Sequence, residues 1–226
     1  RVADRLDIPF YAINFQSEFR QIIDYFVEQY LHGRTPNPCV VCNHWLRFGK
    51  LFEYADSVDA QFVATGHYAR IERADDHVEL LRAPDPVKDQ TYFLSQMTYE
   101  QIAHAHFPLG DFTKPEIRKM AIAQNFPNAT RKDSQGICFL GKINYRDFIK
   151  KYLGENIGKI VNRDTGDILG EHNGFWFHTI GQRQGLGLSN GPWIVVEKDH
   201  VENVIYVAKG YDPASVYKSK ITLAKF

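Results

Sequence analysis

Two of the three cysteines in the chain, Cys39 and Cys42, form a C-x-x-C pair that directly follows the rigid sequence Pro-Asn-Pro at 36–38. The third, Cys138, ends the distant sequence Lys-Asp-Ser-Gln-Gly-Ile-Cys at 132–138. A cysteine thiolate can attack an electrophile, bind a metal ion or exchange with a disulfide. These residues therefore predict a zinc site, a redox pair, or a pocket in which two distant cysteines meet.

A zinc site and a redox pair both remain open on the residues alone. A structural zinc ion needs four ligands, and no second C-x-x-C is present, so Cys138 and a histidine such as His32, His44 or His67 would complete the set. A redox C-x-x-C normally stands at a helix N-terminus, and Cys42 is expected directly before a helix. The simplest interpretation is that the cysteines are buried small residues.

The third possibility is that one cysteine carries or attacks sulfur and a distant one resolves the product by disulfide exchange. The surroundings of two cysteines favour a thiolate, because Cys42 is expected beside Arg47 and Lys50, and Cys138 follows a basic, glycine-containing approach.

Hydrophobic periodicity predicts the elements of the first half. Residues 6–14 are expected to form a short buried strand, 17–30 a helix that Gly33 ends, and 61–65 a second strand. Between them, a loop carries the C-x-x-C and a helix spans 43–55. The inward residues expected in that helix are Trp45, Phe48, Leu51, Phe52 and Ala55. Alternating helices and strands predict an α/β domain with a mostly parallel sheet.

The second half shows a different pattern. A hairpin is expected over 69–73 and 77–82, a capping box at Thr113 opens a helix to about 125, and Asn144 caps a helix over 145–153. After Gly154, short β-like runs alternate with turn signals, which predicts a small β-rich module. A domain boundary is therefore expected near 140–155.

The overall composition, 44% hydrophobic and 24% charged with zero net charge, is that of an ordinary globular protein. No apolar run is long enough to cross a membrane, and few cysteines favour a reducing, cytoplasmic setting. Total charge does not indicate a nucleic-acid partner, so RNA binding would need local basic patches. Candidates are Arg131 with Lys132, the set Lys142, Arg146, Lys150 and Lys151, and Arg183.

Five motifs, in this order, resemble those of the tRNA-uridine 2-sulfurtransferase (tRNA-specific 2-thiouridylase) family. They are GRTPNPCVVCN at 33–43, ATGHYAR at 64–70, KDQTYFLSQ at 88–96, DSQGICFLG at 133–141 and TIGQRQGLG at 179–187. The resemblance implies a doubly wound parallel sheet of the adenine-nucleotide alpha-hydrolase-like type, with its N-terminal part missing, in a PP-loop domain over 1–141. It further implies a small β-rich central tRNA-binding domain over 142–211 and the start of a C-terminal β-barrel at 212–226.

The resemblance also implies an activity. The family uses ATP with Mg²⁺ to adenylate the wobble uridine in the tRNA anticodon loop, and then transfers persulfide sulfur to C2 to form 2-thiouridine. A sulfur-relay protein donates the persulfide, and no tightly bound metal is expected. Sulfur transfer by direct persulfide attack and transfer by hydrosulfide release both remain open.

The family's site residues map onto this sequence through the motifs. Cys42 matches the nucleophile, and Cys138 matches the cysteine that receives the persulfide. The other matches are Asn37, Pro38 and Cys39 for contact with the target base, Gly66 for ATP, and Lys88, Asp89 and Gln90 for tRNA. Cys39 stands where some members have Asp.

Neighbouring residues are further candidates for holding the flipped base: His67, Tyr68, Gln90 and Tyr92. The family's Ser-Gly-Gly-x-Asp-Ser phosphate loop is not found in this sequence. We therefore expect the chain to be a fragment that does not activate uridine by itself.

Overall fold

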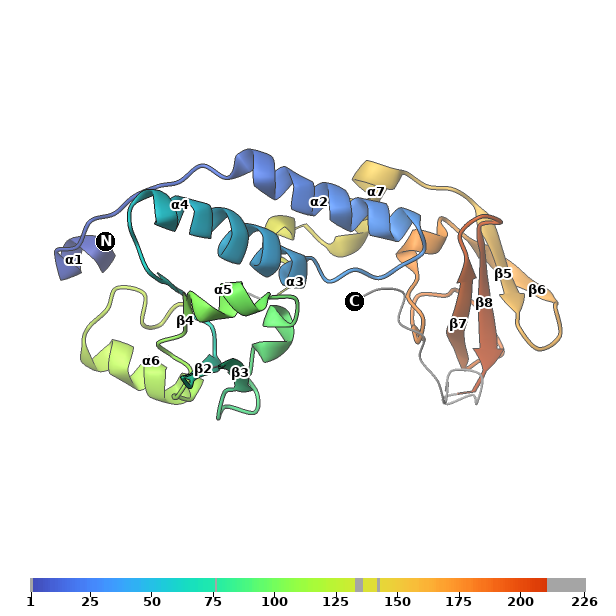
Figure 1. Ribbon diagram of the computed structural model, residues 1–226. Coiled ribbons are helices and arrows are strands. Elements are labelled where there is room, and N and C mark those ends of the chain that lie inside the picture. Colours follow the sequence, from blue (N-terminus) through green and yellow to red (C-terminus); the bar gives the residue numbers. More distant parts are fainter. Residues whose placement is uncertain (1, 76, 133–135, 142, 211–226) are drawn as a thin grey trace. The chain divides into compact units, whose positions relative to one another are not determined.

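A computed structural model of the chain describes residues 2–75, 77–132, 136–141 and 143–210 (Figure 1). These residues fall into two compact units, the first within 2–23 and 37–139 and the second within 24–36 and 140–210. Residues 212–226, where a β-barrel is expected to start, lie outside the described part. The domain bounds 1–141 and 142–211 stay a prediction.

The first unit begins with helix α1 (Val2–Leu6), which is followed by an extended segment over residues 7–15 with no helix or strand. Apolar side chains here face solvent, with Phe10 79% and Tyr11 73% exposed. The predicted buried strand over 6–14 is therefore wrong. A strand needs a neighbour for its backbone N–H and C=O groups, and no described strand pairs with this segment.

Helix α2 (Gln16–Leu31) confirms the predicted helix over 17–30, and its buried face includes Ile22 and Phe26. The helix ends at Gly33, whose φ is +73°. The amide of Gly33 donates to the carbonyl of Tyr30 at 3.0 Å, and the amide of Arg34 donates to that of Gln29 at 2.9 Å. These bonds satisfy carbonyls at the helix end, and glycine adopts the positive φ without a Cβ clash.

The C-x-x-C lies inside a helix, and the prediction of a loop followed by a helix from residue 43 is wrong. Helix α3 (Pro38–Cys42), the π-helix η1 (Asn43–Lys50) and helix α4 (Leu51–Ser57) form one continuous helix, here called the cysteine helix (Figure 1). Its first turn forms because the Asn37 side chain accepts a hydrogen bond from the amide of Cys39 at 3.1 Å. Proline at the first helical position suits this start.

The cysteine helix turns Phe48 and Ala55 into the core, as predicted, with exposures of 1% and 7%. Trp45, which was also expected to point inward, is 45% exposed. The inward side of the helix shifts in the wider π-helical turn, so an α-helical period misplaces this residue. The core around Phe48 consists of Ala69, Leu94, Met97, Ala105 and Phe107.

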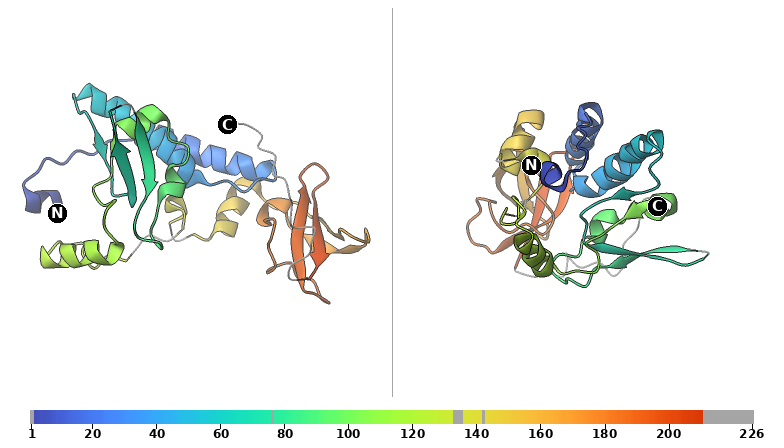
Figure 2. Two further views of the ribbon diagram at one scale, coloured as in Figure 1. Left: turned by 60° about the horizontal axis from the view of Figure 1, so that its bottom comes forward. Right: turned by 90° about the vertical axis from the view of Figure 1, so that its left-hand side faces the viewer.

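Two small sheets flank this core. Strand β1 (Val63–Ala64) pairs in parallel with β4 (Ala105–His106). Strand β1 is shorter than the strand expected over 61–65. Strands β2 (Ala69–Arg73) and β3 (Val78–Arg82) form the predicted antiparallel hairpin, visible in the left view of Figure 2.

The remaining elements of the first unit are short. They are η2 (Thr91–Leu94), α5 (Tyr99–Ala103), α6 (Lys114–Ala123) and η3 (Cys138–Leu140). The capping box of Thr113 and Glu116 opens α6 as predicted.

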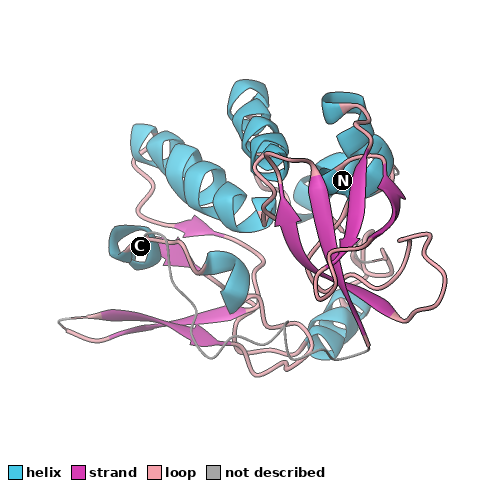
Figure 3. Ribbon diagram, turned by 90° about the vertical axis from the view of Figure 1, so that its right-hand side faces the viewer, coloured by secondary structure: helices cyan, strands magenta, loops and turns pink. Residues whose placement is uncertain are grey.

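The second unit contains helix α7 (Tyr145–Leu153), the short η4 (Phe175–Phe177) and a four-stranded sheet (Figure 3). The Asn144 side chain accepts from the amide of Asp147 at 2.9 Å, which confirms the predicted cap. The strands are β5 (Gly158–Asn162), β6 (Ile168–His172), β7 (Trp193–Asp199) and β8 (Val204–Lys209) in the order β6-β5-β8-β7. Strands β5 and β8 are parallel, and the other two pairs are antiparallel. This sheet confirms the predicted β-rich module.

No helix in the described residues is long and apolar enough to cross a membrane.

Candidate functional site

The three cysteines all belong to the first unit. Cys39 and Cys42 lie near the two ends of α3 and are half-buried, whereas Cys138 is exposed at the start of η3. All three are free thiols. The site therefore combines two sheltered sulfur atoms with one that solvent can reach.

Burial raises the pKa of the Cys42 thiol above its ordinary value, and the positive charge of Arg47 only partly opposes this effect. Burial also raises the pKa of Cys39. The expectation that the surroundings of Cys42 favour a thiolate is thus wrong in this structure. Cys42 ends α3 and does not stand at the free N-terminus, where unpaired amides would have stabilised a negative charge.

Cys138 lies close enough for its charge to act on both other thiols. A negative charge on Cys138 raises the pKa of Cys39 and of Cys42. Like charges disfavour each other only over a limited range, so Cys138 lies within range of charge interaction with the C-x-x-C. This electrostatic coupling of the three thiols is the main chemical feature of the site.

Two of the residues expected to contact the target base have structural contacts of their own. The Asn37 side chain caps α3 through the amide of Cys39, and Pro38 is buried. Their place at the start of the cysteine helix fixes the position of Cys39 and Cys42. A role in base contact stays a prediction.

Gly66, expected near ATP, is exposed just after β1. A Cβ placed on it would lie 3.7 Å from Cδ1 of Leu109, which is an ordinary contact. Packing within the described chain therefore gives no reason for glycine here. Close approach of a ligand to the backbone is one reason that remains.

His67 and Tyr68, considered above as base-holding residues, are both buried, whereas Tyr92 is 66% exposed. The ring of His67 has a partner at each nitrogen: Nδ1 lies 2.7 Å from Oγ1 of Thr65, and Nε2 lies 3.4 Å from a guanidinium nitrogen of Arg47. Burial, followed by the charge of Arg47, lowers the pKa of His67 to about 4. His67 is therefore a neutral, partnered histidine at neutral pH.

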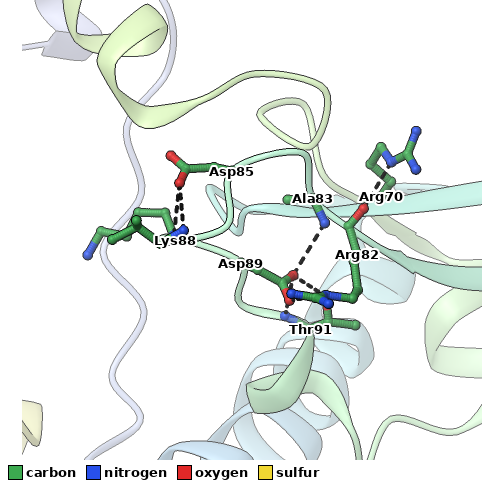
Figure 4. Close-up of polar contacts among 8 residues, drawn as sticks. Arg70, Arg82, Ala83, Asp85, Lys88, Asp89 and Thr91 are labelled. Carbon is green, nitrogen blue, oxygen red and sulfur yellow. Dashed lines mark hydrogen bonds and ion pairs between the residues drawn. The ribbon is translucent and has the colours of Figure 1, made fainter.

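Residues 83–91, here called the lysine loop, contain the expected tRNA-contacting segment (Figure 4). Asp89 accepts hydrogen bonds from the amide of Ala83 at 3.3 Å, from Nε of Arg82 at 3.0 Å, and from the amide and hydroxyl of Thr91. Burial opposes ionisation of Asp89, yet these bonds outweigh it and hold its pKa below the ordinary value. The carboxylate is thus occupied in holding the loop.

Gln90 is also used internally, because its side-chain oxygen accepts from the amide of Tyr68 at 3.0 Å and its amide donates to the carbonyl of Tyr68 at 2.9 Å. These two bonds join the lysine loop to the ATGHYAR motif. By contrast, the side chain of Lys88 extends away from the carboxylates of Asp85 and Asp89 (Figure 4). Lys88 is half-buried, and its charge contributes to the lowered pKa of Asp85.

Sequence reasoning missed Asp85. This buried residue accepts from the amide of Lys114 at 2.8 Å and from those of Val87 and Lys88 at 2.9 and 3.1 Å. Those bonds, the one from Lys114 first, lower its pKa. The Asp-Pro dipeptide at 85–86 is a turn signal that could have revealed it.

The described residues contain no group of three or more His, Cys, Asp and Glu side chains placed to hold a metal ion.

Comparison with known proteins places the chain in a family. Residues 1–142 match the family model described as "tRNA methyl transferase HUP domain", and residues 146–209 match the one described as "tRNA methyl transferase PRC-barrel domain". The chain is also 50% identical, over all 226 residues, to the tRNA-specific 2-thiouridylase MnmA of Parabacteroides distasonis. The chain belongs to the tRNA-specific 2-thiouridylase family. The α/β class of the first domain and the resemblance given above are both confirmed.

Other relatives in the 2-thiouridylase family show the same likeness. The protein of Porphyromonas gingivalis is 47% identical over 226 residues, and that of Geobacillus kaustophilus is 46% identical over 224 residues, or 97% of this chain. The chain spans 63%, 62% and 60% of the lengths of these three relatives.

Proposed function

We propose that the protein containing this chain forms 2-thiouridine in tRNA, with Cys42 as nucleophile and Cys138 as the carrier of a persulfide. The observation that supports the proposal is the electrostatic coupling of Cys138 with Cys39 and Cys42, since two cysteines far apart in sequence must come together to act on one substrate. The relatives' names support sulfur transfer, whereas the family model's description mentions methyl transfer. Paired thiols suit the former chemistry.

Sulfur transfer by these residues balances as follows. A relay protein places a sulfane sulfur on exposed Cys138, giving a persulfide. The thiolate of Cys42 attacks the inner sulfur, the S–S bond breaks, and hydrosulfide leaves for C2 of the activated uridine. In the alternative, the outer sulfur of the persulfide attacks C2 first. Cys42 then attacks the sulfur of Cys138, which releases the thiolated uridine and forms the disulfide. Both routes oxidise the two cysteines to a disulfide, which an external thiol reductant restores.

ATP, with Mg²⁺, would supply activation of the uridine C2 oxygen, turning it into a leaving group. Gly66 would lie beside the nucleotide, because its backbone is exposed and a Cβ there would meet only an ordinary contact with Leu109. The family's phosphate loop is not among the printed residues. We therefore predict that the printed chain does not activate uridine alone.

For tRNA, the proposal assigns different tasks within the lysine loop. Lys88 contacts RNA phosphate, while Asp89 and Gln90 hold Lys88 in place. Asn37, Pro38 and Cys39 lie at the start of the cysteine helix, where the base of the anticodon loop would meet Cys42.

The test is complementation of a bacterial strain that lacks its tRNA 2-thiouridylase with the full-length gene. Wild type, Cys42→Ser and Cys138→Ser are compared by mass spectrometry of tRNA nucleosides, and Cys39→Ser is measured beside them as the other variant of the C-x-x-C. We expect wild type to restore 2-thiouridine and the Cys42 and Cys138 variants to abolish it. Restoration by Cys138→Ser would show that Cys138 is not the sulfur carrier.

A non-reducing peptide map of protein isolated after turnover tests the pairing. A disulfide between Cys42 and Cys138 supports the proposal. A Cys39–Cys42 disulfide would instead favour a thiol–disulfide oxidoreductase, and one bound zinc ion per chain would favour a zinc-stabilised RNA-binding module.

A further inference from the structure

The cysteine helix carries an unusual turn directly after Cys42. Residues Asn43–Lys50 form a π-helix, and the amide of Leu51 bonds to the carbonyl of Leu46, five residues back. In an α-helix, a residue five positions on lies ~140° around the axis. In a π-helix, hydrogen bonds join residues five apart, so the wider turn carries Arg47 back toward the face of Cys42.

Two side chains from other elements hold this widened turn. Nδ2 of Asn43, which is buried, donates to the carbonyl of Phe93 at 2.9 Å. Nε2 of Gln101 donates to the carbonyl of His44 at 3.0 Å. π-helical turns are rare and occur frequently at functional sites, so external support of this one needs an explanation.

His67 determines where the guanidinium of Arg47 lies. Arginine can only donate hydrogen bonds, so Nε2 of His67 is the acceptor and the ring proton resides on Nδ1, which donates to Thr65. The ring is fixed between Phe48 and Phe107, at centroid distances of 6.1 and 5.8 Å. A neutral, immobile acceptor orients Arg47 without neutralising its charge.

Arg47 opposes the effect of burial on both thiols of the C-x-x-C, and it lies one π-helical turn from Cys42 but about two helical turns from Cys39. For Cys42, it is the strongest influence that opposes burial, ahead of the effects of Cys138 and Cys39, both of which raise the pKa. For Cys39, the opposing effect of Arg47 is weaker than the raising effect of Cys138. In the described part of the chain, the titratable groups that act on the two thiols are Arg47, Cys138 and, for Cys42, also Cys39.

We propose that Arg47, oriented by the buried His67, is a positioning residue that stabilises the thiolate of Cys42 in preference to that of Cys39. The inference rests on the proposed function only in that the Cys42 thiolate then acts as the nucleophile of sulfur transfer. It explains how one member of a C-x-x-C, although half-buried, becomes the more reactive one. Arg47 remains exposed to solvent, so its effect depends on ionic strength.

The test measures rates of alkylation by iodoacetamide in the reduced protein, resolved for Cys39 and Cys42 by mass spectrometry, from pH 6 to 10. In the wild type, we expect the titration midpoint of Cys42 to lie below that of Cys39. Arg47→Gln should raise the Cys42 midpoint by about 0.5–1 pH unit and the Cys39 midpoint by less. The matched control is Lys50→Gln, because Lys50 ends the same π-helix but pairs with Glu53 at 2.7 Å; it should leave both midpoints unchanged.

Variants at His67 test the orienting contact. His67→Gln keeps an acceptor for Arg47 and should preserve the Cys42 midpoint, whereas His67→Phe removes it and should raise that midpoint. A merely structural role would shift both cysteines together in both variants.

A salt titration of the wild type needs no variant. Between 0.05 and 1 M NaCl, the Cys42 midpoint should rise more than that of Cys39, because salt screens the exposed guanidinium. Equal midpoints for the two cysteines, insensitive to salt and to Arg47→Gln, would overturn the inference. None of these assays uses tRNA or ATP, so their outcome is independent of whether 2-thiouridine is formed.

Discussion

The cysteine helix and the lysine loop belong to the same unit but treat their ionisable groups in opposite ways. In the lysine loop, the carboxylates of Asp85 and Asp89 each accept several hydrogen bonds, and their pKa values are lowered. In the cysteine helix, burial raises the pKa of Cys39 and Cys42, and a single guanidinium opposes it.

The difference teaches how the two regions divide their tasks. Several hydrogen bonds to one carboxylate stabilise its charge and hold the surrounding loop in place. A buried thiol with only one nearby positive charge has an ionisation that depends on its surroundings. The hydrogen-bonded carboxylates therefore fix the shape of the lysine loop, whereas the ionisation of the thiols in the cysteine helix depends on the charges around them.

The largest expected effect comes from removing the central carboxylate of the lysine loop. Asp89→Ala leaves several donors without their acceptor and should lower the free energy of unfolding by about 3 kcal/mol, as measured by urea denaturation. Asp89→Asn, which keeps one oxygen acceptor, should cost less. Unchanged stability in Asp89→Ala would remove the contrast between the two regions.

A second prediction concerns pH and His67. The folded pKa of about 4 lies below the unfolded value of about 6.5, so below pH 6.5 the unfolded state binds the proton first. The contribution of His67 to stability should therefore fall by about 3 kcal/mol as pH drops from 6.5 to 4. Urea midpoints measured across this range should show a weaker pH dependence in His67→Gln, and no such weakening in His77→Gln, a change at an exposed histidine.

The bond between Asn43 and the carbonyl of Phe93 links the two regions, since Phe93 lies in η2 just beyond the loop. Asn43→Ala should destabilise the protein by about 1–2 kcal/mol. Lys50→Gln, which breaks an exposed ion pair on the same helix, should cost less than about 0.5 kcal/mol. Both variants are compared with wild type by thermal unfolding. Equal losses of stability would show that the hydrogen bond from Asn43 to Phe93 does not stabilise the π-helix.

The smallest effect on stability is expected at Lys88. Lys88→Ala should change the free energy of unfolding by less than about 0.5 kcal/mol, because the side chain extends away from both carboxylates of the loop and its charge is the smallest of the influences on Asp85 (Figure 4). On the proposed function, it should weaken tRNA binding and reduce the slope of log Kd against log salt by about one. An unchanged slope would mean that Lys88 makes no phosphate contact.

Much of the fold could be predicted because its signals are local. Helix α2, the β2–β3 hairpin and the caps at Thr113 and Asn144 follow from residues that lie within a few positions of one another. The exposed segment 7–15 could not, because strand pairing depends on residues far away in sequence. The start of the cysteine helix was missed because Asn-Pro was interpreted as loop, although Asn followed by Pro also suits an N-cap and first helical residue.

For the site, the sequence identified residue types better than their roles. Motifs gave Cys42, Cys138 and Lys88, but the internal use of Asp89 and Gln90 depends on contacts that only the folded loop reveals. Arg47 was expected beside Cys42, but the π-helix has no simple sequence signal, so the wider turn between them could not be foreseen.

The exposure of Trp45 makes the cysteine helix optically distinct. The other two tryptophans, Trp176 and Trp193, are buried and belong to the second unit. An indole in water emits at longer wavelength than one in an apolar core, so the red edge of the emission reports on Trp45 alone. Quenching by iodide or by a bound ligand can therefore follow events three residues from Cys42, while the blue edge records unfolding of the other unit.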